Sequence, residues 1–145
     1  MTPDVNVLVA AFRPDHPHHN PARAWLNDAV QQAAFKHTPL VLLGMVVTGF
    51  LRVTTNPRVF KQIDAPEDVV TFVDTLLACP GVDYQASGAA WSGLREMCLS
   101  HQASGNLVSD AWIAATVLQV GETLCTFDRD FTRLLPPDKL QLIKA

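Results

Sequence analysis

Short apolar runs alternate with stretches of helical periodicity along this chain. Val5–Phe12 is a compact run rich in β-branched residues, and Leu40–Leu43 is a second apolar run. Such runs are typical of strands that are buried on both faces of a sheet. Val82–Tyr84, Thr123–Thr126 and Leu140–Ile143 are shorter stretches of similar character. We expect strands at each of these positions.

Other stretches have the spacing of helices. Between residues 22 and 35, apolar residues recur at intervals of three and four, as on the buried face of a helix. Pro66, Glu67 and Asp68 suit the first turn of another helix. Ser87 can cap a third helix, and Gly121 stops a fourth. We predict helices over 22–35, 65–78, 87–100 and 107–120, and a short helical turn over 128–134.

The segment Gly44–Thr54 is open to two interpretations. It could continue the strand before it, but the spacing of Met45, Phe50 and Val53 suits a helix equally well. Asn56-Pro57 ends the element in either case, because proline disfavours helix in the residue before it. Strands that alternate with helices predict an α/β fold with a parallel sheet.

Length and composition are those of one globular domain. The chain has 145 residues, within the range of about 100–150 that is commonest for domains. Hydrophobic residues make up 48% and charged residues 17%, which excludes a disordered chain. No repeat or linker divides the sequence, so we expect a single domain over residues 1–145.

The net charge of −3 limits how the protein can bind nucleic acid. A protein that holds nucleic acid by bulk attraction alone is usually basic. If this chain acts on RNA, a local basic surface or bound cations must offset the repulsion from the RNA backbone.

Cysteine usage and the N-terminus bear on the compartment. Cys79, Cys98 and Cys125 are odd in number and lack CxxC spacing, so we expect buried free thiols in a reducing environment. The first residues have no basic region of the kind that opens a signal peptide. The longest apolar run, Pro39–Leu51, is shorter than the ~20 residues of a membrane span. A cytoplasmic protein is expected.

Acidic residues stand at the ends of several predicted elements. Asp4 opens the first apolar run, Asp110 lies inside an otherwise apolar helix, and Asp128 and Asp130 follow the strand that ends at Thr126. In parallel sheets, active sites form beyond the strand ends, where distant segments converge. Converging carboxylates suit a hard divalent cation such as Mg²⁺, which could activate a water and stabilise charge on a phosphodiester.

Each acid also has a structural explanation. Asp4 alone could be a solvated residue near the terminus, and Asp128 could simply be a helix N-cap. Asp110 is harder to explain in this way, because a carboxylate buried in an apolar helix is costly without a partner.

Four motifs, in order along the chain, resemble those of a known family. The segments DVNVLVAAF, GFLRVTTNPRVF, GNLVSDAWIAA and LCTFDRDF are similar to PIN domains, and more narrowly to the VapC toxins of bacterial toxin–antitoxin pairs. Each motif alone is weak, but the ordered set spans nearly the whole chain. The resemblance implies a twisted parallel five-stranded sheet with flanking helices, and Mg²⁺- or Mn²⁺-dependent endoribonuclease activity. It also implies a cognate antitoxin as partner and a toxin homodimer.

The resemblance further assigns roles to residues. The family's acids correspond to Asp4, Asp110 and Asp128, as catalytic residues and metal ligands, with Asp130 as a further ligand. Asn6 and Thr126 are at positions that often support the metal site.

One position departs from the family pattern. Gly49 stands where many PIN domains have a glutamate, in Val47-Thr48-Gly49-Phe50-Leu51-Arg52. The missing carboxylate puts metal affinity in doubt, and activity to a smaller degree.

Other residues are less specific. Arg52, Arg58 and Lys61 could bind RNA phosphates or form a solvated basic turn. His16, His18 and His19 resemble a metal-binding group, but a proline-rich loop is usually polar surface. The three tryptophans (Trp25, Trp91, Trp112) fit a core or a dimer interface better than base stacking.

Three functions therefore remain as hypotheses. The first is an RNA-cleaving toxin that cuts phosphodiesters with a metal-activated water. The second is a catalytically weak or silent PIN module that binds RNA or an antitoxin without cutting. Gly49 and the negative net charge favour this hypothesis. The third, a flavodoxin-like or other α/β binding domain, leaves the ordered motifs to coincidence.

Overall fold

The fold, a computed structural model that describes residues 1–144, is built on short parallel strands. β1 (Thr2–Pro3), β4 (Leu124–Thr126) and β5 (Leu140–Leu142) form one sheet in the order β1-β4-β5, with all pairs parallel. β2 (Leu40–Leu43) and β3 (Val82–Gln85) form a second parallel pair. The two parts adjoin, because the Val41 amide donates to the Met1 carbonyl at 2.9 Å. The expected parallel α/β architecture is confirmed, as a three-stranded and a two-stranded part.

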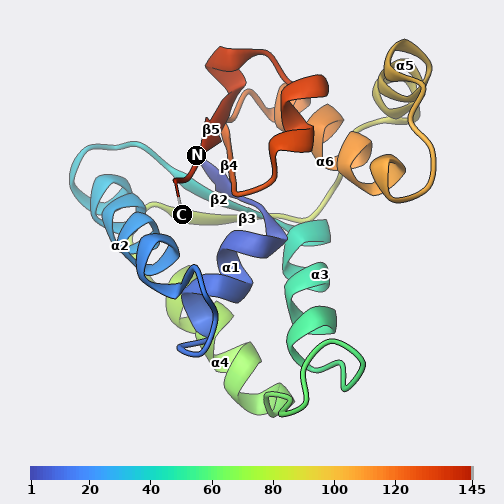
Figure 1. Cartoon of the computed structure of the whole chain (residues 1–145). Helices are drawn as coiled ribbons and strands as arrows, with labels where there is room; N and C mark the ends of the chain where they lie inside the picture. The colour runs from blue at the N-terminus through green and yellow to red at the C-terminus, as the bar shows by residue number, and fades with distance from the viewer. Residues whose placement is uncertain (145) are drawn as a thin grey trace.

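Helices surround these strands (Figure 1). In that view, α1, α3 and α4 lie below the strands, α2 lies to their lower left, and α5 and α6 lie to their right. No helix within residues 1–144 has the length and apolar character of a membrane span. The helical elements are α1 (Val5–Phe12), α2 (His19–Phe35), α3 (Gly44–Thr54), α4 (Pro66–Leu77), α5 (Trp91–His101), α6 (Asn106–Val120) and the 3-10 turns η1 (Arg129–Arg133) and η2 (Pro137–Lys139).

The predicted strand Val5–Phe12 is wrong, because this segment is helix α1. The first strand is the shorter Thr2–Pro3, and Asp4 follows it as the N-cap of α1. An Asp side chain that accepts a hydrogen bond from the first amides favours helix initiation at that point. The run carries no periodicity because α1 is buried on most of its surface, with Val7 to Ala11 all buried.

Most of the other elements lie where the sequence places them. The open question over Gly44–Thr54 is resolved as a helix, α3, which follows β2 directly. Helix α2 begins at His19, three residues before the expected start. The predicted strand Val82–Tyr84 is extended by one residue, and the helical turn after Asp128 is a 3-10 turn.

The predicted cap at Ser87 is wrong. Helix α5 begins at Trp91, and its N-cap is Ala90. The preceding segment is tied to α6 instead: the Ala89 amide donates to Thr116 Oγ1 and the Ala90 amide to Gln119 Oε1, each at 2.9 Å. These bonds hold the backbone in an extended path up to residue 90.

The core lies between the strands and the surrounding helices. Phe50 of α3 and Phe131 of η1 are the largest fully buried side chains. All three cysteines are free, as expected; Cys125 is buried, whereas Cys79 and Cys98 are only half-buried. The packing brings the ends of β1 and β4 and the first turn of α6 toward one cavity, which contains the candidate site.

Candidate active site

Asp4 is held at the junction between β1 and α1. Its amide donates to the Cys125 carbonyl of β4 at 2.8 Å. Its carboxylate accepts hydrogen bonds from the Val5 amide at 2.7 Å, from Asn6 Nδ2 at 3.0 Å and from Thr126 Oγ1 at 2.7 Å. The residue is only 6% exposed. A strand end, a helix start and the neighbouring strand therefore orient this carboxylate.

Asn6 and Thr126 connect Asp4 to Asp128. Asn6 Nδ2 donates to Thr126 Oγ1 at 3.0 Å, and Asn6 Oδ1 accepts from the Phe127 amide at 3.3 Å. The Asp128 amide donates to the same Thr126 hydroxyl at 3.0 Å. Residues that are more than a hundred positions apart in sequence thus form one polar network.

Asp110 and Asp128 face the same space as Asp4. A cavity of about 660 Å³ is lined by Asp4, Asn6, Asp110 and Asp128 among others. Asp128 also caps the 3-10 turn η1, since its Oδ1 accepts from the Asp130 amide at 2.8 Å. The N-cap explanation and the cavity position therefore both apply to Asp128.

The three carboxylates repel one another. Burial, followed by the charges of Asp4, Asp128 and Asp130, raises the pKa of Asp110 to about 6. Burial also raises the pKa of Asp4, and the charge of Asp128 adds to this, whereas the hydrogen bonds from Thr126, Val5 and Asn6 act in the opposite direction. A cation placed among these groups would relieve the repulsion, because an opposite charge favours the ionised form.

The donor set fits a hard divalent ion. Carboxylate and amide oxygens are the groups that Mg²⁺ prefers, and it usually binds through one or two carboxylates, waters and substrate phosphates. Within residues 1–144, no three His, Cys, Asp or Glu side chains are arranged to enclose a metal ion by themselves. The arrangement therefore fits an open site that shares its ion with water and substrate.

The remaining predicted site residues are spread more widely. Asp130 is exposed and does not line the cavity, although its charge reaches Asp110. Arg52 of α3 lines the cavity, whereas Arg58 and Lys61 are exposed on the following loop outside its lining. One of the three basic residues is thus at the site itself.

The histidines do not converge on a common point. His16 lines the cavity, His18 stacks on Phe127 with 4.9 Å between ring centroids, and His19 Nδ1 is 2.9 Å from the Ala10 carbonyl. The His16 and His18 rings are neighbours, with 5.7 Å between centroids, but each of the three rings has a different contact.

The tryptophans also differ from one another. Trp112 lines the cavity, Trp25 is half-buried, and Trp91 is 72% exposed. Trp91 is therefore not a core residue, and the dimer interface stays as the prediction for it.

Gly49 lines the cavity from the middle of α3. It is buried, and a Cβ atom at this position would approach Val5 of α1 closely. The position at which the PIN resemblance implies a glutamate therefore lies next to the acids, but a side chain there would require Val5 to shift.

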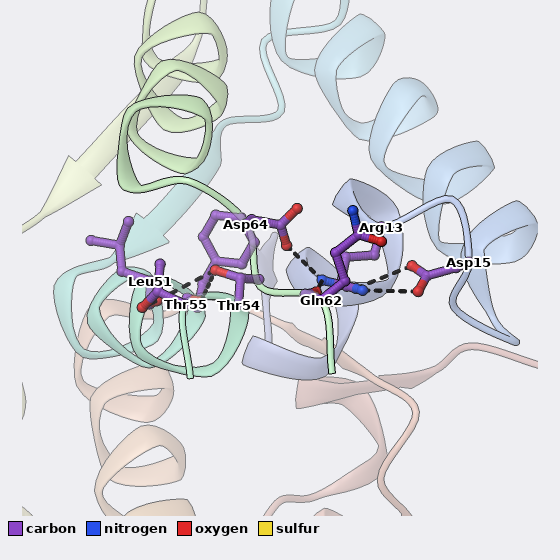
Figure 2. A network of polar contacts seen from close by, with 8 residues as sticks. Arg13, Asp15, Leu51, Thr54, Thr55, Gln62 and Asp64 are labelled. Carbon is purple, nitrogen blue, oxygen red and sulfur yellow. Dashed lines mark hydrogen bonds and ion pairs between the residues drawn. The ribbon is translucent and has the colours of Figure 1, made fainter. Parts of the chain in front are cut away.

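Sequence reasoning missed the residues that shape the far wall of the cavity. No sequence pattern assigns a role to Phe60 or to Arg13, although the Arg13 guanidinium lies 3.8 Å from the Phe60 ring centroid. Figure 2 shows Arg13 between Asp15 and Asp64. An arginine next to a Pro-Asp turn was the only sequence signal, and it is a weak one.

Comparison with known proteins places this geometry in a family. The family model described as PIN domain matches residues 1–134. Ribonuclease VapC43 of Mycobacterium tuberculosis is 38% identical over 131 residues, which are 90% of this chain and 86% of that protein. Ribonuclease VapC25 of the same organism is 34% identical over 131 residues, which are 90% of this chain and 89% of that protein.

Solved structures show the same fold. VapBC2 from Rickettsia felis, solved bound to a DNA fragment from its promoter, has a TM-score of 0.67 at 17% identity and covers 99% of this chain and 98% of that chain. FitAcB from Neisseria gonorrhoeae has a TM-score of 0.58 at 17% identity, with coverage of 92% and 91%. Because the PIN model matches nearly the whole chain and the VapC ribonucleases match it at 38% and 34% identity, the chain belongs to the PIN-domain family of VapC ribonucleases.

Proposed function

We propose that this protein is the toxin of a type II toxin–antitoxin system, an Mg²⁺- or Mn²⁺-dependent endoribonuclease that hydrolyses RNA phosphodiesters. The observation that carries the proposal is the meeting of Asp4, Asp110 and Asp128 in one cavity, where burial, followed by the charges of the neighbouring acids, raises the pKa of Asp110 to about 6. A carboxyl in a cleft whose pKa is raised by burial together with specific charged neighbours is a candidate for a functional site, and a bound cation would offset the repulsion.

In this proposal, Asp4, Asp110 and Asp128 would hold the metal ion together with water and an RNA phosphate, and Asp130 would contribute from outside through its charge or a bridging water. A bound divalent ion would supply Lewis acidity, which lowers the pKa of water and offsets the charge that develops on the phosphodiester. Thr126 donates a hydrogen bond to Asp4 and accepts one from the Asp128 amide, and thereby fixes the positions of the two acids relative to each other. Asn6 braces both Asp4 and Thr126.

Arg52 is proposed to contact an RNA phosphate, because it lines the cavity beside the acids. Arg58 and Lys61 are proposed to bind the RNA backbone farther along, from the exposed loop that follows α3. These basic residues would supply the local positive surface that a chain of net charge −3 needs for RNA.

Partners are proposed on the same basis. Membership of the VapC family favours a cognate antitoxin that inhibits the nuclease. A homodimer is supported by large apolar side chains exposed on the neighbouring helices α5 and α6, namely Trp91, Leu99, Val108, Trp112 and Leu118. The cytoplasmic location stays a prediction from the sequence.

An RNA cleavage assay tests the proposal. Purified protein should cut RNA when Mg²⁺ or Mn²⁺ is added, and excess chelator should stop it. The Asp110→Asn variant keeps the shape of the side chain and should cut far more slowly. Growth arrest on induction of the gene alone, relieved by the antitoxin, is the matching cellular result.

The alternative is a weak or silent PIN module that binds RNA or an antitoxin without cutting. The observation that favours it is Gly49, which leaves the cavity without a fourth carboxylate. RNA that stays intact at millimolar Mn²⁺, with folded protein that still binds RNA, would decide for this alternative.

A further inference from the structure

The cavity is larger than the acidic site needs. Along α3, Thr48 and Gly49 line it beside the acids, and Arg52 and Val53 line it about one turn, or ~5 Å, farther along. His16, Val59 and Phe60 complete this region, which we call the distal end. The distal end therefore combines an apolar wall with two polar side chains, and its α3 residues lie about one helical turn beyond those beside the acids.

The Phe60 ring is held in place by the Arg13 side chain. The Arg13 guanidinium lies 3.8 Å from the centroid of this ring. Arg13 Nε and Nη2 donate to the two carboxylate oxygens of Asp15 at 3.1 and 2.8 Å, and Nη1 donates to Asp64 at 2.8 Å and to the Gln62 carbonyl at 3.0 Å (Figure 2). Because the arginine is buried and fully engaged, the aromatic ring is already ordered before any ligand arrives.

His16 presents a defined donor. Its Nδ1 accepts a hydrogen bond from the His18 amide at 3.1 Å, so in the neutral ring the proton is on Nε2. Burial, helped by the charge of His18, lowers the pKa of His16, which favours the neutral form. The His18 ring stacks on Phe127, the residue before Asp128, and this contact holds the loop close to the acidic site.

Trp112 is less suited to receive a ligand. A Cβ atom on Gly88 would lie 2.7 Å from the Trp112 ring and 2.7 Å from the end of Met45, so the backbone of residue 88 already packs against that indole. Part of the Trp112 indole is therefore covered by the loop at residue 88, although the side chain is 40% exposed and lines the cavity, and Phe60 is the aromatic side chain at the distal end.

We propose that the distal end is a nucleobase subsite, which receives the base of a nucleotide adjacent to the scissile phosphate. The base stacks on Phe60, an acceptor on its edge takes a hydrogen bond from His16 Nε2, and Arg52 contacts the adjoining phosphate. A phosphate alone would not use the apolar surface of Val53, Val59 and Phe60, whereas every base has a face that stacks on an aromatic ring. The position relative to the cut rests on the proposed function.

A binding measurement tests this subsite without depending on cleavage. The probe is a fluorescein-labelled RNA hexamer of mixed sequence, compared with a hexamer of the same backbone in which every residue is abasic. Ca²⁺ replaces Mg²⁺, and a gel checks that the RNA stays intact. We expect the wild-type protein to bind the base-containing hexamer at least about tenfold more tightly, as one stacked base should give.

Substitutions assign the preference to the distal end. Phe60→Leu should remove most of the tenfold difference, Phe60→Tyr should keep it, and His16→Ala should reduce it more than His16→Gln. Phe35→Leu is the matched control, because Phe35 is 83% exposed at the end of α2, outside the cavity. Hexamers with 2-aminopurine at single positions should show quenching that Phe60→Leu abolishes and Phe60→Tyr retains.

The possible outcomes are distinct. Equal affinity of the wild-type protein for both hexamers would overturn the subsite, as would a preference that survives Phe60→Leu. Thermal melting of each variant shows whether a loss of base preference comes from unfolding. If Phe60→Leu is unfolded, a base preference retained by Phe60→Tyr supports the subsite, and a preference lost in folded Phe60→Tyr contradicts it. A protein that prefers bases but never cuts RNA would overturn the proposed function and keep the subsite. A protein that cuts RNA without any base preference would keep the proposed function and overturn the subsite.

Discussion

Val5 of α1 occupies the space beside Gly49 of α3: a Cβ atom on Gly49 would lie 2.8 Å from Val5 Cγ2. Real Cβ atoms almost never come so close to another carbon, and the nearest atom is a branched methyl group rather than the end of a flexible chain. Residue 49 is in a regular helix, so its backbone alone would tolerate a side chain. The glycine is therefore required by packing between two helices.

The first prediction concerns Gly49→Glu. We expect this change to destabilise the protein by about 1–3 kcal/mol, the usual cost of overpacking. Val5→Ala removes the opposing methyl groups, so Val5→Ala/Gly49→Glu should be close in stability to Val5→Ala alone. Denaturant unfolding measures the three free energies of unfolding, and calorimetry with Mn²⁺ measures whether the double variant binds metal more tightly than wild type.

Two results would contradict this prediction. If Gly49→Glu is as stable as wild type, Val5 moves aside easily and the contact is not restrictive. If the folded double variant binds Mn²⁺ no better than Val5→Ala alone, a carboxylate at residue 49 does not reach the metal site.

The second prediction concerns Asp110 and stability. Because its pKa is raised to about 6, the folded state binds more protons than the unfolded chain between about pH 4 and 6. The free energy of unfolding contributed by this group is therefore highest below pH 4 and is lost as pH rises through 6. In metal-free buffer at pH 7, Asp110→Asn should be more stable than wild type by roughly 1–2 kcal/mol after allowance for solvent screening.

The comparison across pH is the check. The stability difference between wild type and Asp110→Asn should be small at pH 4, reach its maximum above pH 6, and shrink when Mg²⁺ is added. Asp74→Asn, an exposed acid on α4, serves as control and should show no such difference. Equal stability of Asp110→Asn and wild type at pH 7 would mean that the carboxylates do not repel as strongly as their positions imply.

The third prediction concerns the Thr126 hydroxyl. It donates to Asp4 and accepts from Asn6 and from the Asp128 amide. Thr126→Val keeps the shape but leaves the Asp128 amide without its partner and removes one hydrogen bond each from Asp4 and Asn6, at a cost of about 1–3 kcal/mol. The rate of RNA cleavage should fall by more than tenfold, because the orientation of both acids is lost. Thr126→Ser should retain most of the stability and most of the cleavage rate. A fully active Thr126→Val would show that the network is not needed to position Asp4.

The fourth prediction is self-association through α5 and α6. Light scattering at tens of micromolar should give twice the monomer mass for wild type, because apolar patches of this kind usually mark an interface. Leu99→Lys on α5 should give a monomer. Phe35→Ser, which removes from α2 an apolar residue that is even more exposed than Leu99 (83% against 61%), should remain a dimer. A monomeric wild-type protein would remove the proposal.

Much of the fold could be predicted from the sequence, because helix periodicity and turn residues are local signals. The failure at Val5–Phe12 has a physical cause. A short apolar run that is buried on all sides has no periodicity, so its pattern does not distinguish a strand from a helix. The available signal was Asp4, an N-cap residue immediately before the run.

The acids of the site were predictable for a different reason. Asp4 and Asp128 follow strands β1 and β4, which are paired and parallel, so their ends must meet. The distal end of the cavity was not predictable. Arg13 and Asp64 are 51 residues apart and meet only because two loops pack together, and no local pattern encodes such a contact.

The last prediction concerns Arg13, which joins these two loops. Its side chain is only 8% exposed, and it binds Asp64 and the Gln62 carbonyl through one nitrogen and Asp15 through the other two. Lysine has one charged nitrogen and cannot make this set of bonds. Arg13→Lys should therefore lower the free energy of unfolding by about 1–3 kcal/mol. It should also speed amide exchange at Asp64, whose amide donates to the Thr54 carbonyl at 3.0 Å.

Asp15→Asn is the matched control for Arg13→Lys. Asp15 is largely exposed, and Arg13 holds the pKa of its carboxyl below the ordinary value, but exposed ion pairs contribute little to stability. Amide exchange at Asp64 should therefore be nearly unchanged in Asp15→Asn and clearly faster in Asp64→Asn. If Asp15→Asn and Arg13→Lys accelerate exchange equally, the exposed pair rather than the buried one ties the loops together, and Phe60 is held less firmly than these contacts imply.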